Sequence, residues 1–481
     1  MNKIDYTKIA KKSLTLLNSK YSDDITVSIS SLHAIKHHPE YIKKIKKLSV
    51  FKLTKIIIKN LIQIFFIFTL FLKKKKQFKK EKIDVLVISH LTNIDQLNNS
   101  QDPYFGMLEN FLRDRKIKVK KLLINHIIKN KIKKNKNKIL FSRNLNAKFE
   151  IQILKKKFFE FFKILKILIN SNDRILNKIL KRSIISLFES ETTFALKFKY
   201  ELEMFLKIFK PKVIITTFEG YGWERLCFNI AKKKNKKTRC IAYQHTPLNH
   251  NNVSAFYKIK KRYQPDLIWC SDKKSFNTLK SKKIKKILYI GNLKYKNEKD
   301  YKIKHSSNKK IRTCLVIPEG INDECLKLLQ FSINCCKEDK NLKFIWRFHP
   351  ITKIHKILKS LNFKNVVLND QIIISKQKKL LRDISRSNFV LYRGSSAVVE
   401  SVKKGLIPLY LNCDQNINID PLKEVINKKN YVNTVKDFYL KIKFYESKKF
   451  KKVKLIKNFS KLYESKIKKN LALNSLFNEK I

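Results

Sequence analysis

The stretch VIITTFEGYGWERLCFNIAKK, residues 213–233, decides the fold class. Its first five residues are β-branched, which is typical of a strand buried in a sheet, and the apolar residues after Trp223 recur at helical spacing. A second apolar run, RCIAYQ at 239–244, follows after a short polar segment. This strand, helix, strand order predicts an α/β protein whose parallel sheet is covered on both faces.

The same alternation continues on both sides of this stretch. Further strands are predicted at 83–89, 266–270 and 287–290, and a second series at 313–317, 344–348, 366–368, 389–392 and 407–411. Helices are predicted at 323–336 and 396–404, and the lysine-rich region 115–210 is predicted to be mostly helical. The two series predict two Rossmann-like halves.

Composition divides the chain into four parts. Residues 1–80 are predicted to form a helical extension, 81–295 a first Rossmann-like domain with a helical insert, 311–430 a second Rossmann-like domain, and 431–481 C-terminal helices. The segment between the two domains is rich in lysine and has no sustained apolar pattern, so we expect it to be a linker.

The chain carries a formal net charge of +70. Its heavy use of Lys, Ile, Asn and Phe indicates A/T-rich coding, so a solvated lysine surface is the simplest interpretation. Such a charge attracts polyanions, but no zinc spacing or aromatic ribonucleoprotein motif favours a specific nucleic acid. An anionic membrane surface fits the charge equally well. The eight cysteines show no metal spacing, which predicts a reducing, cytoplasmic context.

The most apolar stretch is Ile56–Leu72, which four lysines follow directly. Lys59, Asn60 and Gln63 interrupt it, and it is too short for a membrane-spanning helix. Two interpretations stay open, a buried core helix and a helix lying in the membrane interface. The second predicts a peripheral protein on the inner face of the plasma membrane. No signal-peptide apolar region is expected at the N-terminus.

Glycine is rare, with seven residues in 481, and four of them stand beside polar residues that suit phosphate binding. These are Gly220, Gly222, Gly320 and Gly394. Glycine is retained where no other residue fits the backbone. Because ligands of parallel sheets bind beyond the carboxyl ends of the strands, we expect the clusters around these glycines to converge.

Two motifs of the second half are predicted to bind a phosphate. The first, Arg347-Phe348-His349-Pro350, ends a strand with a guanidinium fork and an imidazole. The second, Arg393-Gly394-Ser395-Ser396, joins a strand to a helix, so its hydroxyls and free backbone amides point at one spot. A strand-end arginine with a surface histidine, and an ordinary serine N-cap, are the structural alternatives.

Two acidic residues accompany these motifs. Glu400, one turn into the helix, is predicted to reach a ribose hydroxyl or to face solvent. Glu319, followed by Gly320, is predicted to approach a base or the transferred group, and a simple turn explains this pair almost as well.

The first half supplies candidates for the chemistry. Glu219 at a strand end is a candidate general base, and His245 competes with it from an uncharged stretch at 241–257. A structural role is equally expected for either residue. His90, Asp102 and Tyr104 follow the first strand, where an acceptor would enter. No D-x-D pair, G-K-[ST] loop or H-E-x-x-H motif is present, so neither a metal nor another cofactor is predicted.

These motifs resemble those of a known group of enzymes. Phe348-His349-Pro350 and SSAVVE at 395–400 resemble the His-Pro and Ser-Ser motifs of bacterial sialyltransferases and Kdo transferases, which use CMP-sugars. Glu219-Gly220 resembles the motif that carries their base, although Phe218 replaces the usual second acidic residue. Gln244–Leu248 resembles the His-containing loop of the teichoic-acid glycerophosphotransferases, which use CDP-glycerol. The chain thus resembles the GT-B glycosyltransferases of bacterial surface-carbohydrate synthesis over residues 213–411, with weaker support at 85–107.

The resemblance implies a GT-B fold, in which two Rossmann-like domains face a central cleft. It implies metal-independent transfer of a sugar from a nucleotide donor, with a CMP-sugar favoured, to a surface polysaccharide or lipid-linked glycan. The first domain would bind the acceptor and the second the donor. Three alternatives stay open: a CDP-alditol phosphotransferase, a GT-B-like sugar-nucleotide epimerase, and a non-catalytic polyanion-binding protein.

Overall fold

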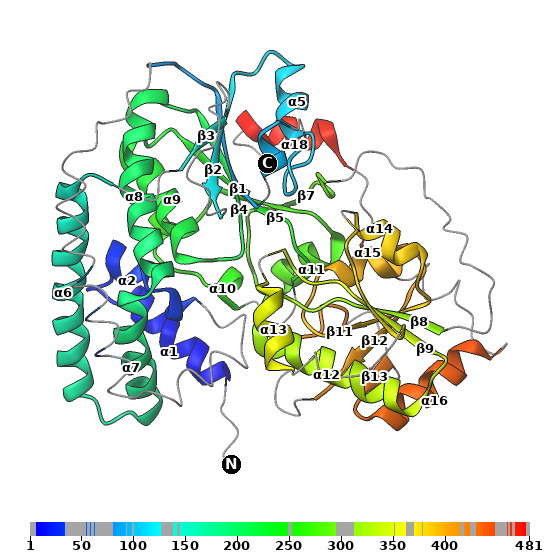
Figure 1. Cartoon of the computed structure of the whole chain (residues 1–481). Coiled ribbons are helices and arrows are strands. Elements are labelled where there is room, and N and C mark those ends of the chain that lie inside the picture. The colour runs from blue at the N-terminus through cyan, green and yellow to red at the C-terminus, as the bar shows by residue number, and fades with distance from the viewer. Residues whose placement is uncertain are drawn as a thin grey trace.

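The computed structural model places most of the chain in two α/β domains (Figure 1). It describes residues 6–33, 54, 58, 62, 80–92, 94–98, 101–126, 138–141, 145–248, 253–294, 312–350, 352–361, 370–377, 379–413, 418–423, 430–447, 459, 462–463 and 467–477. Of the apolar stretch Ile56–Leu72, only Ile58 and Ile62 are described, and both are helical and exposed. The strand predicted at 366–368 lies outside the described residues.

The first domain is built on a seven-stranded sheet with the order β3-β2-β1-β4-β5-β6-β7, in which every neighbouring pair is parallel. Its strands are β1 (Val85–Leu91), β2 (Val119–Asn125), β3 (Lys138–Leu140), β4 (Val213–Thr217), β5 (Arg239–Gln244), β6 (Leu267–Cys270) and β7 (Ile287–Tyr289). All five residues of β4 are buried, as a central strand requires. The strands predicted at 213–217 and 239–244 are therefore confirmed with their bounds.

Strand β2 is the main element of this sheet that the sequence prediction missed. It lies in the lysine-rich region that was predicted to be mostly helical, and its sequence VKKLLIN includes two lysines. Lys121 is nevertheless buried, because its ammonium group lies 2.7 Å from a carboxylate oxygen of Glu109. A buried ion pair of this kind cannot be seen in a local pattern.

Helices cover both faces of the first sheet. They are α1 (Tyr6–Asn18), α2 (Asp24–Ser28), α5 (Leu108–Arg113), α6 (Ala147–Ile169), α7 (Arg174–Phe188), α8 (Ser190–Phe209), α9 (Gly222–Lys234), α10 (Val253–Phe256) and α11 (Lys273–Ser281), with 3₁₀ turns η1 (Ser30–Leu32), η3 (Ile94–Leu97) and η4 (Lys261–Tyr263). The long helices α6 to α8 form one side of the domain (Figure 1). These three helices confirm that most of the lysine-rich region 115–210 is helical, as predicted.

Residues 6–33 pack into the core of the first domain. Ile9, Leu17 and Val27 belong to the same buried cluster as the strand residues Leu86 and Ile214. Residues 6–33 of the predicted N-terminal extension are therefore packed as part of the first domain. The boundary placed at residue 80 stays a prediction.

The second domain is built on a six-stranded parallel sheet with the order β10-β9-β8-β11-β12-β13. Its strands are β8 (Arg312–Val316), β9 (Leu342–Trp346), β10 (Ile372–Ile374), β11 (Phe389–Tyr392), β12 (Ile407–Leu411) and β13 (Tyr431–Val432). Its helices are α12 (Asn322–Glu338), α13 (Ile354–Ser360), α14 (Leu380–Ser385), α15 (Ala397–Lys403) and α16 (Val435–Glu446). Separate apolar clusters pack on the two faces of this sheet.

Contacts of the C-terminal helix and of α11 connect the two parts of the chain. The C-terminal helix α18 (Lys469–Phe477) returns to the first domain, where the Trp269 indole donates to the Ser475 hydroxyl at 2.9 Å. Lys274 of α11 donates to the Pro421 carbonyl of the second domain at 2.7 Å. The α/β class and the two Rossmann-like halves of the predicted GT-B architecture are thus confirmed. None of the described helices combines the length and apolar character needed to cross a membrane.

Candidate functional site

The loop after β4 holds the candidate base Glu219 in a fixed position. The buried carboxylate of Glu224, in the first turn of α9, accepts the backbone N–H groups of Glu219, Gly220 and Tyr221 at 2.7 to 3.0 Å. Gly220 has a φ of +86°, and a Cβ there would lie 2.3 Å from the Ser254 backbone. Only glycine fits this turn, which accounts for one of the few glycines in the chain.

The N-terminal segment forms the back of this loop, which the sequence did not indicate. A Cβ on Gly222 would lie 2.4 Å from the Val27 carbonyl oxygen, so the segment and the start of α9 are in direct contact. The ring of His33 is buried and lies 2.8 Å from the same carbonyl through Nε2. Burial, assisted by Arg225, lowers the pKa of His33 to about 3, so its ring is neutral at physiological pH.

Hydroxyl groups orient the carboxylate of Glu219. Thr246 donates to its Oε1 at 3.1 Å, and the Tyr221 hydroxyl bonds to the same carboxylate. Burial and nearby acidic groups raise the pKa of Tyr221 well above its usual value, so this phenol stays a donor. Glu219 itself is half-buried. These contacts fix the orientation of a half-buried carboxylate, a group that can act as a proton acceptor.

Aromatic and imidazole rings gather beside Glu219. The ring centroid of His90, at the end of β1, lies 5.0 Å from that of Tyr104, which in turn lies 5.0 Å from that of His245. Nε2 of His90 is 3.0 Å from the Thr217 hydroxyl. Desolvation lowers the pKa of His90 to about 3, with a smaller opposing effect of Glu219. The structure therefore brings together four of the five predicted first-domain site residues.

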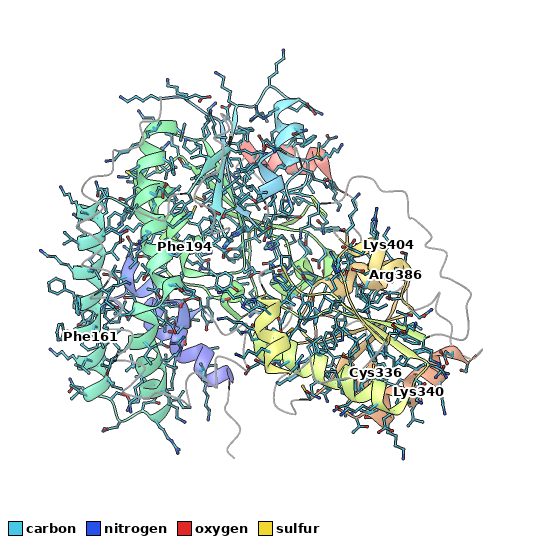
Figure 2. The ribbon with its side chains drawn as sticks, viewed as in Figure 1. Phe161, Phe194, Cys336, Lys340, Arg386 and Lys404 are labelled. Carbon is cyan, nitrogen blue, oxygen red and sulfur yellow. The ribbon has the colours of Figure 1, made fainter. Side chains whose placement is uncertain are left out.

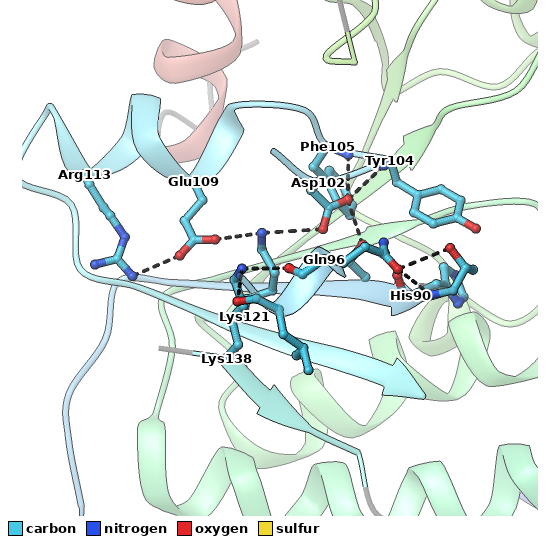
Figure 3. Close-up of polar contacts among 12 residues, drawn as sticks. His90, Gln96, Asp102, Tyr104, Phe105, Glu109, Arg113, Lys121 and Lys138 are labelled. Atoms are coloured by element: carbon cyan, nitrogen blue, oxygen red, sulfur yellow. Dashed lines mark hydrogen bonds and ion pairs between the residues drawn. The ribbon is translucent and has the colours of Figure 1, made fainter. Parts of the chain in front are cut away.

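Asp102 is the fifth, and the structure gives it a different task from acceptor binding. Its Oδ1 accepts the Ser89 hydroxyl and the backbone N–H groups of Tyr104 and Phe105 at 2.8 to 3.0 Å. Its Oδ2 lies 3.4 Å from the Lys121 ammonium, and its side chain is only 3% exposed. Figure 3 shows these contacts, which direct the carboxylate into the protein. Asp102 thus fixes the turn that carries Tyr104.

In the second domain, two arginines predicted to bind phosphate are paired with buried acids. Arg347 donates to a carboxylate oxygen of Asp383 at 2.5 Å and to the Gln377 carbonyl at 2.9 Å. Arg393 is fully buried and contacts the carboxylate of Glu324. Both guanidinium groups are therefore bonded within the domain, and Arg393 is not presented to solvent.

The exposed members of the two phosphate motifs lie at the same sheet edge. His349 and Pro350 are exposed after β9, and desolvation lowers the pKa of His349. Ser396 is exposed at the start of α15 and makes no side-chain capping bond, while Ser395 is buried. The Ser396 hydroxyl is thus not used as an ordinary helix cap.

Glu319 packs against the loop that carries these serines. A Cβ on Gly394 would lie 2.5 Å from both carboxylate oxygens of Glu319, so a larger residue there would displace this carboxylate. Gly320 follows it in a half-buried position. A carboxylate accepts hydrogen bonds and repels phosphate, so this side of the loop suits a hydroxyl or amino group.

Lys294 joins the two halves of the site, and it was missed. It follows β7, and its ammonium group lies 5.5 Å from the ring centroid of Tyr104. Desolvation lowers the pKa of Lys294, whereas the carboxylates of Glu400, Asp102 and Glu219 act in the opposite direction. One cation therefore interacts with Glu400 of the second domain and Glu219 of the first. No local pattern distinguishes this lysine from its many neighbours in the sequence.

No protein-family model matches the chain, and no curated protein matches it in sequence. Among solved structures it is similar to S. aureus MnaA with UDP (10% identity, 82% of this chain and 95% of that chain, TM-score 0.46). It is also similar to the lipopolysaccharide outer core galactosyltransferase WaaB (12% identity, 82% and 99% covered, TM-score 0.45). A third is the Neisseria meningitidis UDP-GlcNAc 2-epimerase bound to UDP-GlcNAc (13% identity, 82% and 99% covered, TM-score 0.43).

Proposed function

We propose that this chain is a metal-independent glycosyltransferase. It would move a sugar from a nucleotide donor, with a CMP-sugar favoured, to a surface polysaccharide or a lipid-linked glycan. One observation carries the proposal. The Lys294 ammonium group lies 5.5 Å from the ring centroid of Tyr104, beside Glu219, which hydroxyl groups orient after β4. Its charge acts on the carboxylates of both Glu219 and Glu400, so a cation lies within electrostatic range of a candidate base and of a candidate donor-binding helix.

In this proposal Glu219 takes the proton of the acceptor hydroxyl. Its carboxylate is half-buried, and the hydroxyl groups of Thr246 and Tyr221 fix its orientation toward the incoming proton. The hydroxyl oxygen then forms the new bond to the anomeric carbon, and the bond from that carbon to the donor phosphate breaks. His245 is the alternative base, and the rings of Tyr104 and neutral His90 give the acceptor sugar an apolar face to stack on.

The leaving phosphate gains negative charge in this step. Lys294 supplies the nearby positive charge, and His349 with Ser395 and Ser396 supplies hydrogen bonds on the side of the second domain. Arg347 and Arg393 then act indirectly, since their ion pairs hold the strand ends that carry these residues.

The carboxylates of the second domain would recognise the nucleoside. Glu400 would accept from a ribose hydroxyl, and Glu319 beside Gly394 would accept from the base. Cytosine presents an exocyclic amine that an acidic side chain can bind, whereas uracil presents a carbonyl oxygen there. This chemistry supports a cytidine nucleotide. The acceptors named above lie at the inner face of the plasma membrane, where a basic peripheral protein would meet them.

Calorimetry tests the donor site. CMP and CDP are expected to bind the purified protein at moderate salt more tightly than UDP and GDP, and His349→Ala and Ser396→Ala should both weaken that binding. Ser385→Ala is the control, because Ser385 is an exposed serine of the same domain that bonds only to its own helix, α14. Equal weak binding of all four nucleotides, lost on adding salt, would instead indicate a general polyanion-binding protein.

Product analysis separates the enzymatic alternatives. A glycosyltransferase that uses a CMP-sugar releases CMP and makes a glycosidic bond to the acceptor. A CDP-alditol phosphotransferase also releases CMP but leaves a phosphodiester, and an epimerase consumes no acceptor. Mass spectrometry of the acceptor product therefore decides between these reactions.

A further inference from the structure

Helix α6 is the outermost element on one side of the first domain (Figure 1). Its 23 residues bury one face against the domain, and the inward residues include both of its acidic side chains. Glu150 pairs with Lys197 at 2.6 Å, and Glu160 pairs with Lys163 at 2.6 Å. The helix therefore has no exposed acidic residue.

The outward face of α6 is unusually apolar. Its side chains remain exposed to 76% at Phe159, 62% at Phe162 and 74% at Ile169, with Ile151 and Phe158 less exposed. Most of these positions are separated by three, four or seven residues, so they form one strip along the helix. Figure 2 shows Phe161, which is half-buried at the edge of this strip, on the outer side of the molecule. Contiguous exposed apolar surface of this kind indicates an interaction site.

Lysines border the same strip. Lys148, Lys155 and Lys166 are exposed, and they recur at helical spacing beside the apolar residues. No ion pair is found for these three among the described residues. Exposed aromatic side chains next to unpaired lysines are the composition of a helix that lies in the interface of an anionic bilayer.

We infer that this face of α6 docks the protein on an anionic lipid surface. The rings of Phe159 and Phe162 enter the headgroup layer, and the three lysines reach the lipid phosphates. A second copy of the chain fits this face poorly, because two identical lysine-bordered strips would repel each other. The docking surface thus lies on a described helix that the sequence prediction did not consider for this role. It is separate from the site around Glu219, and it does not require that site to be a transferase.

Vesicle co-sedimentation tests the inference. The wild type is expected to bind vesicles of phosphatidylcholine with phosphatidylglycerol, and to bind phosphatidylcholine alone weakly. Phe159→Ser with Phe162→Ser should lower binding to the anionic vesicles by roughly tenfold or more, because apolar burial supplies part of the affinity. Leu440→Ser with Phe444→Ser on α16 is the matched control, since these residues are also exposed, at 57% and 48%, on a lysine-bearing helix of the second domain.

Emission of an added tryptophan gives an independent readout. The native Trp269 and Trp346 are fully buried and Trp223 is half-buried, so Phe159→Trp would report on the α6 surface. Its emission should shift to the blue with anionic vesicles and stay unchanged with neutral ones. Equal vesicle binding by the two double variants, or no blue shift, would overturn the inference. The inference would also be overturned if the wild type bound no vesicles and the α6 double variant lost a self-association that the wild type shows. That result would assign this face to a second copy of the chain.

Unchanged thermal unfolding of the double variants would show that the substitutions act at the surface. Nucleotide calorimetry on the same proteins keeps this test separate from the proposed function. A protein that binds CMP but no vesicles would contradict only the docking surface, and one that binds vesicles but no nucleotide would contradict only the transferase.

Discussion

At the edge of the first sheet, Glu219 is held by hydroxyl groups, whereas at the edge of the second sheet Arg347 and Arg393 are paired with buried carboxylates. All three residues follow or end a strand in the same way, and all three were predicted to serve the ligand. The two sheet edges differ in the bonded partners of these residues, because in the second domain buried acids neutralise the arginines.

The physical reason lies in desolvation. A buried guanidinium is costly unless an acid neutralises it, and Glu324 and Asp383 are both almost fully buried beside the arginines. Once formed, such a pair stabilises the loop and withholds its charge from a ligand. Glu219 differs from these arginines, because hydroxyl groups of Thr246 and Tyr221 bond to its carboxylate and it stays half-buried.

The largest effect is expected from breaking the buried ion pair between Arg393 and Glu324 in the second domain. Arg393→Met should lower the free energy of unfolding by about 3 to 5 kcal/mol, because Glu324 would be left buried and uncompensated. Urea unfolding measures this loss. Arg393→Met combined with Glu324→Leu should restore most of it. Unchanged stability together with lost nucleotide binding would show that Arg393 contacts the donor after all.

On the first-domain side, Glu219→Gln should lower turnover by about 10²- to 10⁴-fold while nucleotide affinity is kept, because the amide cannot accept the proton. Steady-state kinetics with calorimetry separates the two quantities. Glu191→Gln, an exposed substitution on α8, is the control. If Glu219→Gln were active and His245→Gln inactive, His245 would be the base.

The residue that joins the two edges gives a third test. Lys294→Met should lower turnover by about 10²-fold, with a smaller effect on CMP binding, because the charge acts mainly on the departing phosphate. Lys294→Arg should recover part of the rate. Lys285→Met, at an exposed lysine just before β7, should be silent. Equal loss of turnover and of CMP affinity would mean that Lys294 binds the ground state of the donor.

The smallest effect concerns the segment behind the Glu219 loop. The pKa of His33 is about 3 in the folded protein and about 6.5 when unfolded, so below pH 6.5 only the unfolded chain takes up this proton. Stability due to His33 is therefore present above pH 6.5 and is lost as the pH falls toward 3. Between pH 7 and pH 5 this loss is about 2 kcal/mol.

Urea unfolding at the two pH values measures this effect. His33→Gln should remove the part due to His33, whereas a similar part due to His90, whose pKa is also lowered to about 3, should remain. Among the described residues of the second domain no histidine is buried, so this acid sensitivity belongs to the first domain. A wild type and a variant that lost equal stability on acidification would show that His33 takes up its proton in the folded state too.

Many of the strands could be predicted from local patterns. The strands at 213–217, 239–244, 389–392 and 407–411 have the predicted bounds, because continuous apolar runs in a highly charged chain leave few alternatives. Strands β2, β3, β10 and β13 were missed. The last three have only two or three residues each, and β2 depends on the ion pair of Lys121.

The sequence by itself determined the α/β class, the two series of strands and the clustering of polar residues at strand ends, because periodicity and rare glycines are local properties. Only the tertiary structure decided which of those polar residues are buried in internal contacts and which stay accessible. Asp102 and Arg393 turn into the protein, Lys294 reaches both domains, and residues 6–33 support the Glu219 loop. The reason is that the cost of burying a charge depends on partners that are distant in the sequence, and folding alone brings those partners together.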